Sequence, residues 1–360
     1  MMKCSTGVRV AVRTHATTLS LRVRCTQLAT EDGNRIASNS FVAAVDGVDH
    51  TEVPTPLDAD ALIPLSGGEL IEASRRAESS LVSFEGLPPG DKTVEVWLPQ
   101  GAIVDLLAIE SDAPVDPAPM PPGRTWLHHG SSISHCIEPQ RPTSTWPVVA
   151  ARAAGVSVVN LSGAGQCHLD PFMSDAIAQT PADVISLKLG VNNVGGRSMD
   201  QRTFVSAVHG FIDRIRQGHP TTPIVVVSPI FADENEDRPG PTAIEPTAHG
   251  TQYFRFDGDT SDIQRGALTL PIVREHLRYV VGARQQLGED ISYLDGLSLY
   301  GPDDAGAAPL PDGIHPDTAI YEEMGRRFAT LVFGPTGLIP GNGRPRRPPD
   351  HGGARESYPS

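Results

Sequence analysis

The chain has 360 residues, of which 39% are hydrophobic and 20% are charged, and its net charge is −14 at neutral pH. This length exceeds what one hydrophobic core usually holds and predicts two domains, in a composition typical of globular proteins. The negative charge argues against nucleic acid or an anionic membrane surface as partner, because like charges repel. No stretch is apolar over the about 20 residues that cross a bilayer, so we expect no membrane span and a cytoplasmic protein.

The first 115 residues show the periodicity of β-strands. Apolar and polar positions alternate in GVRVAVR, LSLRVRC and KTVEVWLP, and turn-forming residues separate these runs. In Thr93–Leu98 the three aliphatic side chains share one face. Six or more such strands without a helical pattern predict an antiparallel, jelly-roll-like β-sandwich over residues 1–115. The Pro-rich segment 116–123 is predicted to be a linker.

From residue 124 the pattern changes to strands that alternate with helices. Short apolar runs occur at TWLHHG, VSVVNLS, DVISLKLG, PIVVVSPI and ISYLDG, and helical patterns lie between them. Five strands with crossover helices predict a doubly wound five-stranded parallel sheet, flavodoxin-like in type, over residues 124–335. The tail at 336–360 is rich in Pro, Gly and Arg and is predicted to be disordered.

The second half also contains a last helix and one unusually long segment between strands. The last helix is predicted to begin at Pro316 and to end at Gly334. The side chains that it is expected to bury are Tyr321, Met324, Phe328 and Leu331. The segment Ile230–Gly266 is long for a loop in a compact domain, which favours a lid or a substrate wall. A surface insertion without function is the equally open alternative.

Polar groups follow the predicted parallel strands at their carboxyl ends, where doubly wound sheets bind their ligands. Ser132 follows the first strand, a turn with Gly165 follows the second, and Asn192 follows the third. Asp312 and His315 come after the fifth strand, and among 12 histidines His315 alone lies in a D-x-x-H pattern. Each residue alone is weak evidence, because serine and asparagine are common in turns and helix caps. Together they supply the hydroxyl, amide, backbone N–H groups and Asp–His pair that acyl transfer requires.

In these blocks the chain resembles the SGNH (GDSL) hydrolase superfamily, over about residues 124–334. That family carries a G-D-S-L-like first block, an Asn…Gly second block, a G-x-N-D third block and a D-x-x-H last block. The resemblance implies that Ser132 is the nucleophile and that Asp312 and His315 are the acid and base of the triad. It further implies an oxyanion hole formed by Ser132, Gly165 and Asn192, and no metal or organic cofactor.

The chain departs from the family pattern at two positions. Ser131 stands where the family has the Asp before the nucleophile, and Asn193 stands where it has the Asp of the third block. The first change leaves Ser131 as an alternative nucleophile, although its position in the block favours Ser132. Neither change removes a catalytic group.

The β-rich half adds a narrower resemblance, to GDSL enzymes with an N-terminal sandwich. These include certain carbohydrate esterases, and acyltransferases that place an aryl acyl group on a tetracycline-type polyketide. The segments HHGSSISHC and GAGQCHLDPF are similar to the latter, actinobacterial-type group.

The motifs therefore predict a serine-dependent carboxylic-ester hydrolase that acts on an acylated small molecule or sugar. An acyltransferase that moves an acyl group from an activated ester or thioester to a hydroxyl of a natural product would need the same residues. A catalytically inactive binding module is the third possibility, and the complete set of catalytic groups argues against it.

Several other polar residues lie near the motifs. Lys188 lies in a strand that should be buried, so we expect it to pair with a carboxylate beneath the active site. His135 and His168 lie close to the motifs, and hydrogen-bonded structural roles are favoured for both over pocket lining. Cys136 and Cys167 also lie close to them, and the sequence leaves open whether they interact. No cysteine pair has metal-ligand spacing.

Overall fold

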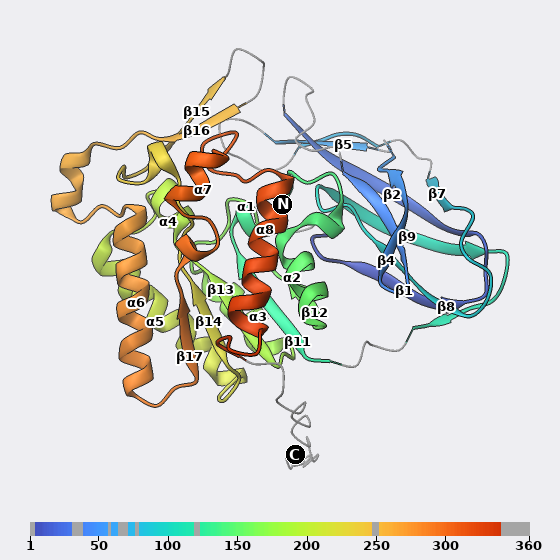
Figure 1. Ribbon diagram of the computed structural model, residues 1–360. Coiled ribbons are helices and arrows are strands. Elements are labelled where there is room, and N and C mark those ends of the chain that lie inside the picture. Colours follow the sequence, from blue (N-terminus) through green and yellow to red (C-terminus); the bar gives the residue numbers. More distant parts are fainter. Residues whose placement is uncertain are drawn as a thin grey trace, which may run out of the picture.

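The computed structural model places a β-rich part and an α/β part side by side (Figure 1). It describes residues 4–30, 39–56, 59–63, 71–75, 79–118, 123–246 and 252–339. One hydrophobic core lies between the sheets of the β-rich part, and a larger core surrounds the sheet of the α/β part. No helix among these residues is long and apolar enough to cross a membrane.

Two sheets make up the β-rich part. The first is antiparallel, in the order β10-β1-β8-β3-β4, with bounds Val115–Pro117, Arg9–Thr14, Lys92–Trp97, Ser40–Val45 and Val48–Pro54. The second is centred on β2 (Leu19–Thr30), which pairs with β9 (Ala102–Ser111), β7 (Ser80–Phe84) and β5 (Ala59–Ile63), and β5 pairs with β6 (Ile71–Arg75). The β2–β5 pair is parallel and the others are antiparallel.

The apolar faces of these two sheets meet, as the alternating pattern predicts. Val94 and Val96 of β8 pack in one cluster with Leu21 of β2 and Val82 of β7. The pairing of β10 with β1 extends the first sheet into the segment predicted as a linker, of which residues 119–122 lie outside the described structure. The domain bounds proposed from the sequence therefore stay a prediction.

The α/β part is built on a five-stranded parallel sheet in the order β12-β11-β13-β14-β17. Its strands are Ser157–Asn160, Thr125–Gly130, Val184–Lys188, Ile224–Val227 and Ile291–Leu294. The predicted doubly wound sheet is confirmed, with each strand where a short apolar run lies in the sequence. The runs are mostly apolar on both sides because helices cover both faces of the sheet, so that neither set of alternating side chains meets water.

Helices α2 (Trp146–Ala154) and α8 (Thr318–Phe328) pack together on one face of this sheet. There the Trp126 ring of β11 stacks on Phe328, with centroids 4.9 Å apart, and tilts against Trp146. The other face is covered by α5 (Gln201–Gly218), which packs against α3 (Pro171–Gln179) and α6 (Leu270–Gln286). On that face Phe211 of α5 stacks on His129. Figure 1 shows α2 on the side of the β-rich part.

The last helix differs from its prediction at both ends. It begins at Thr318 and not at Pro316, because the Asp317 carboxylate caps it by accepting the Ile320 N–H. After Phe328 the backbone widens into a π-helical turn at Ala329–Phe333, which breaks the helical spacing. The prediction that Leu331 is buried is therefore wrong, since 36% of this residue is exposed.

The start of the predicted disordered tail folds back onto this turn. The backbone N–H groups of Leu338 and Ile339 donate to the carbonyls of Leu331 and Val332. Residues 340–360 of the tail lie outside the described structure.

Candidate active site

Ser132 is the first residue of the short helix α1 (Ser132–His135), two residues after the end of strand β11, which lies next to the central strand β13. Its hydroxyl oxygen lies 2.8 Å from Nε2 of His315. The neighbouring Ser131 is buried, and its hydroxyl makes no hydrogen bond with any described residue. The structure thus brings Ser132 and His315 together, and Ser131 makes no hydrogen bond to this pair.

Asp312 orients His315 from within the same turn. Its Oδ2 lies 2.7 Å from Nδ1 of His315, and its Oδ1 accepts the backbone N–H groups of Ile314 and His315 at 3.0 and 2.6 Å. Because an ionised carboxylate only accepts, Nδ1 carries the proton and Nε2 is free to accept from Ser132. Gly313 permits this turn, since its φ is +85° and a Cβ there would approach the Phe254 carbonyl oxygen to 2.8 Å.

The charges of this turn act on its two titratable groups. Burial alone raises the pKa of Asp312, but the hydrogen bonds from His315 and the backbone outweigh it and lower that pKa. Burial alone lowers the pKa of His315, but the negative charges of Glu138 and Asp312 outweigh it and raise that pKa. His315 is therefore a stronger base than an isolated imidazole.

Glu138 is a second carboxylate beside His315 that the sequence motifs did not indicate. Its Oε1 lies 3.9 Å from Nδ1 of His315, and its Oε2 accepts a 2.9 Å hydrogen bond from the Tyr321 hydroxyl. It is the only acidic residue between Ser132 and Asp170, which is the one signal that the sequence offered.

The turn with Gly165 is linked to the short helix α4 (Val191–Gly195), which carries Asn192, and to the end of strand β11, which precedes Ser132. The Cys167 N–H donates to Oδ1 of Asn192 at 3.1 Å, which leaves the amide NH₂ for another partner. Gly163, two residues before Gly165, donates its N–H to the carbonyl of Gly130. The backbone N–H groups of Ser132 and Gly165 have no hydrogen-bond acceptor among the described residues.

His168 and His135 are both held by hydrogen bonds, as favoured from the sequence. Nε2 of His168 lies 3.2 Å from the Gly165 carbonyl oxygen and Nδ1 lies 3.0 Å from the Ser198 hydroxyl. The buried His135 bridges the two halves of the chain, because its Nε2 lies 2.7 Å from the Gln100 carbonyl oxygen. His168 therefore fixes the turn that presents the Gly165 N–H.

Two further expectations are settled by packing. The carboxylate partner expected for Lys188 is wrong, because its ammonium makes no hydrogen bond or ion pair with any residue that the structure describes. Cys136 and Cys167 are both free, buried thiols with separate partners, Ile133 O for the first and His129 for the second. Burial raises the pKa of Cys167 to about 12, so this thiol stays protonated.

The long segment after β14 forms one wall beside His315. It contains a hairpin of β15 (Thr242–Pro246) and β16 (Gln252–Phe256), and the ring of Phe254 meets the His315 ring edge-on with centroids 5.2 Å apart. Asn235 joins this hairpin to the Asp312–His315 turn, because its amide donates to the carbonyls of Phe254 and Gly313 at 3.0 and 2.9 Å. Of the two alternatives for this segment, the contact with His315 favours a wall of the site.

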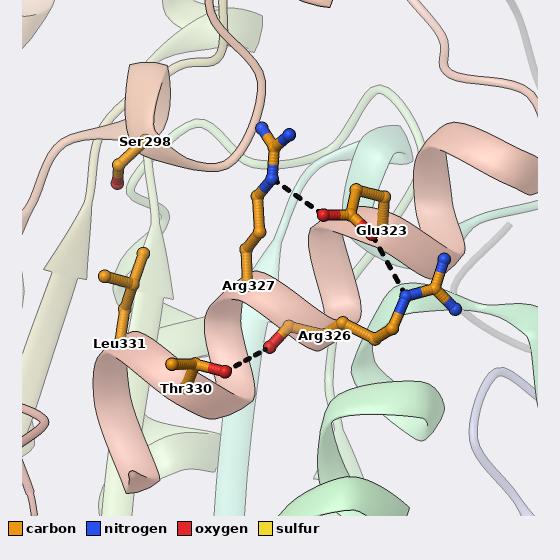
Figure 2. A pocket seen from close by; sticks show the side chains of 6 residues that line it. All are labelled: Ser298, Glu323, Arg326, Arg327, Thr330 and Leu331. Atoms are coloured by element: carbon orange, nitrogen blue, oxygen red, sulfur yellow. Dashed lines mark hydrogen bonds and ion pairs between the residues drawn. The ribbon is translucent and has the colours of Figure 1, made fainter.

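A separate shallow depression of about 350 Å³ lies along α8 and the turn after it (Figure 2). Its lining residues are Ser298, Glu323, Arg326, Arg327, Thr330 and Leu331. Glu323 pairs with both arginines, and Arg327 also pairs with Asp304. The depression contains no residue of the sequence motifs, and its charged side chains pair with acidic or basic neighbours. It is therefore not a candidate active site.

Comparison with known proteins fits this geometry. Residues 125–237 match the model of the GDSL-like lipase/acylhydrolase family, a range that includes Ser132, Gly165 and Asn192. No protein with a curated description matches the chain in sequence.

Solved structures match nearly the whole chain. A salicylyl-acyltransferase from a tetracycline biosynthetic pathway is 26% identical, with a TM-score of 0.71 over 90% of this chain and 81% of that chain. A family two carbohydrate esterase from Clostridium thermocellum, in complex with cellohexaose, is 16% identical, with a TM-score of 0.62 over 91% of this chain and 92% of that one. One from Cellvibrio japonicus is 16% identical, with a TM-score of 0.54 over 91% and 88%. Residues 125–237 thus carry a GDSL-like lipase/acylhydrolase match on a parallel sheet, and together with the acyltransferase neighbour this supports an enzyme that acts on ester bonds.

Proposed function

We propose that the protein is a serine-dependent carboxylic-ester hydrolase that acts on an acylated small molecule or sugar. The observation that supports this most directly is one line of hydrogen bonds from Ser132 Oγ through His315 to Asp312, at 2.8 and 2.7 Å. Hydroxyl, imidazole and carboxylate in this order are the arrangement that activates a serine toward a carbonyl carbon.

In the proposed reaction, Oγ of Ser132 attacks the ester carbonyl while Nε2 of His315 takes the hydroxyl proton. Asp312 stabilises the resulting imidazolium through the Nδ1 hydrogen bond. His315 then gives the proton to the departing alcohol, which leaves an acyl group on Ser132. Water attacks this acyl-enzyme with His315 again as the base, and the acid is released.

Negative charge develops on the carbonyl oxygen during both attacks. The N–H groups of Ser132 and Gly165 and the amide of Asn192 are proposed to receive it, because none of the three is tied up by the contacts described above. Losing one such donor usually costs about 2.7–4 kcal/mol of transition-state stabilisation.

An acyltransferase is the second candidate, and one observation favours it. The salicylyl-acyltransferase is 26% identical over 90% of this chain, whereas the carbohydrate esterases are 16% identical. In this function an activated ester or thioester acylates Ser132, and a hydroxyl of a natural product takes the place of water. The triad chemistry is otherwise unchanged.

The first experiment measures release of p-nitrophenol from the acetate and butyrate esters by the wild type, Ser132→Ala and His315→Ala. We expect both substitutions to lower kcat by about 10³-fold or more, because they remove nucleophile and base. Ser131→Ala is the matched control and should keep activity within about twofold, since its hydroxyl has no partner to lose. Full activity in Ser132→Ala would contradict the assignment of the nucleophile.

The same assay separates the two candidate functions when a polyhydroxylated aromatic acceptor is added. Faster release together with an acylated acceptor, detected by mass spectrometry, identifies a transferase. Unchanged release with free acid as the only product identifies a hydrolase. Folded wild type that releases nothing from any ester or thioester would leave the binding module as the explanation.

A further inference from the structure

Glu138 and Tyr321 lie against the proposed triad without a part in its chemistry as described so far. We propose that Glu138, held in place by Tyr321, is a second carboxylate that stabilises the charged form of His315 during acyl transfer. Glu138 is thus a positioning residue that acts through the imidazole. This inference rests on the proposed function, because it assumes that His315 is the base.

The distances assign different roles to the two carboxylates. Asp312 Oδ2 accepts a hydrogen bond from the Nδ1–H of His315 at 2.7 Å, and that nitrogen has no second proton to donate. Glu138 Oε1 lies 3.9 Å from the same nitrogen, too far for a hydrogen bond but within the range where an opposite charge stabilises an imidazolium. Glu138 therefore acts by charge alone.

Hydrogen bonds hold both the side chain of Glu138 and the backbone next to it. The Tyr321 hydroxyl, on the buried face of α8, donates to Oε2 at 2.9 Å. Asn39 donates to the carbonyls of Ile137 and Pro139 at 3.0 and 2.7 Å, so the backbone before and after Glu138 is fixed from the β-rich half.

The energetic reason for a role is that the placement of Glu138 is unfavourable while His315 is neutral. The side chain is only 26% exposed, and its desolvation together with the nearby charge of Asp312 raises the pKa of Glu138. This unfavourable term is relieved when His315 becomes an imidazolium, which happens only as Ser132 attacks. An interaction that is stronger in the transition state than in the resting enzyme accelerates the chemical step.

The groups around His315 come from five parts of the chain. They are Asp312 from its own turn, Ser132 from α1, Glu138 from the segment after α1 and Tyr321 beside it from α8, while the hairpin contributes the uncharged ring of Phe254. Both carboxylates raise the pKa of His315. Removing one of the two charges lowers it, so the acid limb of the pH profile moves to lower pH.

The test compares the pH dependence of kcat/KM and kcat for p-nitrophenyl acetate in the wild type, Glu138→Gln and Glu138→Asp. Glutamine keeps the shape and the contact with Tyr321 but removes the charge. We expect its acid limb to move down by at least about half a pH unit and its plateau kcat to fall about 3- to 10-fold, with KM changed less. Glu138→Asp keeps the charge at a longer distance and should restore part of the shift.

Glu322→Gln is the matched control. Glu322 is the residue after Tyr321 on the same helix, and its carboxylate accepts a hydrogen bond from Ser144 instead of facing His315. Its pH profile should coincide with that of the wild type. An acid limb in Glu138→Gln that coincides with the wild type, while the enzyme turns over normally, overturns the inference.

A second measurement does not depend on turnover. The imidazole of His315 is titrated by NMR in the Ser132→Ala protein with and without Glu138→Gln, and its resonance is identified by its loss in His315→Gln. A lower His315 pKa in the double variant is expected, and an equal pKa rejects the role of Glu138. Absence of ester turnover in the wild type would instead reject the proposed function, and the two failures are thereby distinguished.

Discussion

At the scale of single residues, Lys188 is the most unusual side chain outside the candidate site. It lies in the central strand β13, only 2% of it is exposed, and its ammonium has no partner among the described residues. Burial lowers the pKa of Lys188 to about 8, against an ordinary value near 10.4. The folded protein therefore holds this proton less tightly than the unfolded chain does.

This difference predicts that Lys188→Met stabilises the protein at pH 7. The unfavourable burial of the charge is fully present below about pH 8 and disappears above about pH 10.4, where the amine is neutral in both states. We expect a gain of about 1–3 kcal/mol in the free energy of unfolding at pH 7, and a smaller gain at pH 10. Urea unfolding of both proteins at the two pH values measures it. A loss of stability at pH 7 would contradict the prediction and would mean that the ammonium is satisfied by a group such as bound water.

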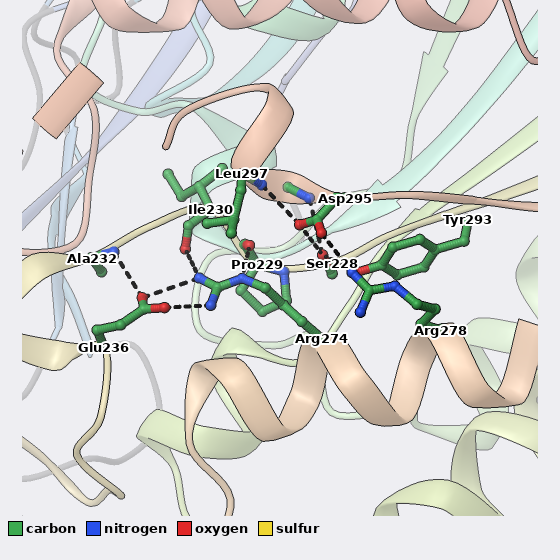
Figure 3. Close-up of polar contacts among 11 residues, drawn as sticks. Ser228, Pro229, Ile230, Ala232, Glu236, Arg274, Arg278, Tyr293, Asp295 and Leu297 are labelled. Carbon is green, nitrogen blue, oxygen red and sulfur yellow. Dashed lines mark hydrogen bonds and ion pairs between the residues drawn. The ribbon is translucent and has the colours of Figure 1, made fainter. Parts of the chain in front are cut away.

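At the scale of elements, helix α6 carries one buried and one exposed arginine (Figure 3). Arg274 is 6% exposed at its side chain, donates to the carbonyls of Pro229 and Ile230 at 2.9 Å, and pairs with Glu236. Arg278, one turn later, is 58% exposed and pairs with Asp295 at 2.7 Å. Arg274 thus fixes the chain that leaves β14 toward Asn235 and the hairpin beside His315.

Arg274→Ala should lower the free energy of unfolding by about 3–5 kcal/mol, because it leaves Glu236 and two carbonyls without a partner in a buried place. Arg278→Ala on the same helix is the control and should cost about 1 kcal/mol or less. Denaturant unfolding of the two variants measures the difference. Equal losses would mean that Arg274 has no special part in holding this segment.

At the scale of the whole molecule, the β-rich half holds the segment that follows Ser132. Asn39 and Gln100 are buried and donate to the backbone around Glu138, with Gln100 reaching the Pro139 carbonyl at 2.6 Å. A second set of contacts lies farther along the interface, where Asp49 accepts from Thr143 and Arg152 at 2.6 Å. The first set of contacts fixes the backbone around Glu138, beside His315. The second set joins the two halves without contacting the candidate site.

The two sets predict different outcomes for two alanine substitutions. Asn39→Ala removes the hydrogen bonds from this amide to the Ile137 and Pro139 carbonyls, and only the bond from Gln100 to Pro139 remains. We therefore expect kcat for p-nitrophenyl acetate to fall about 3- to 10-fold, with an acid limb at lower pH. Asp49→Ala should lower the melting temperature slightly and leave kcat unchanged, because Asp49 and its ion-pair partner Arg152 are partly exposed. Steady-state kinetics and thermal unfolding of both variants test this. An unchanged kcat in Asn39→Ala would show that the sandwich does not influence the site.

The sequence alone was sufficient for the five strands of the parallel sheet and for the β-rich character of the first half. Hydrophobic periodicity is a local property, and in a doubly wound sheet the carboxyl ends of the strands meet at one edge. That rule placed Ser132, Asn192 and the Asp312–His315 pair at the same edge before any packing was known.

Only the tertiary structure decided which groups touch. Ser132 and His315 are 183 residues apart, as are Glu138 and Tyr321, so no local pattern relates them. The preference for Ser132 over Ser131, the second carboxylate beside His315 and the missing partner of Lys188 all follow from side-chain directions. These directions are set by how α1, α8 and the β-rich half pack on the sheet, and packing joins residues without regard to their separation in the chain.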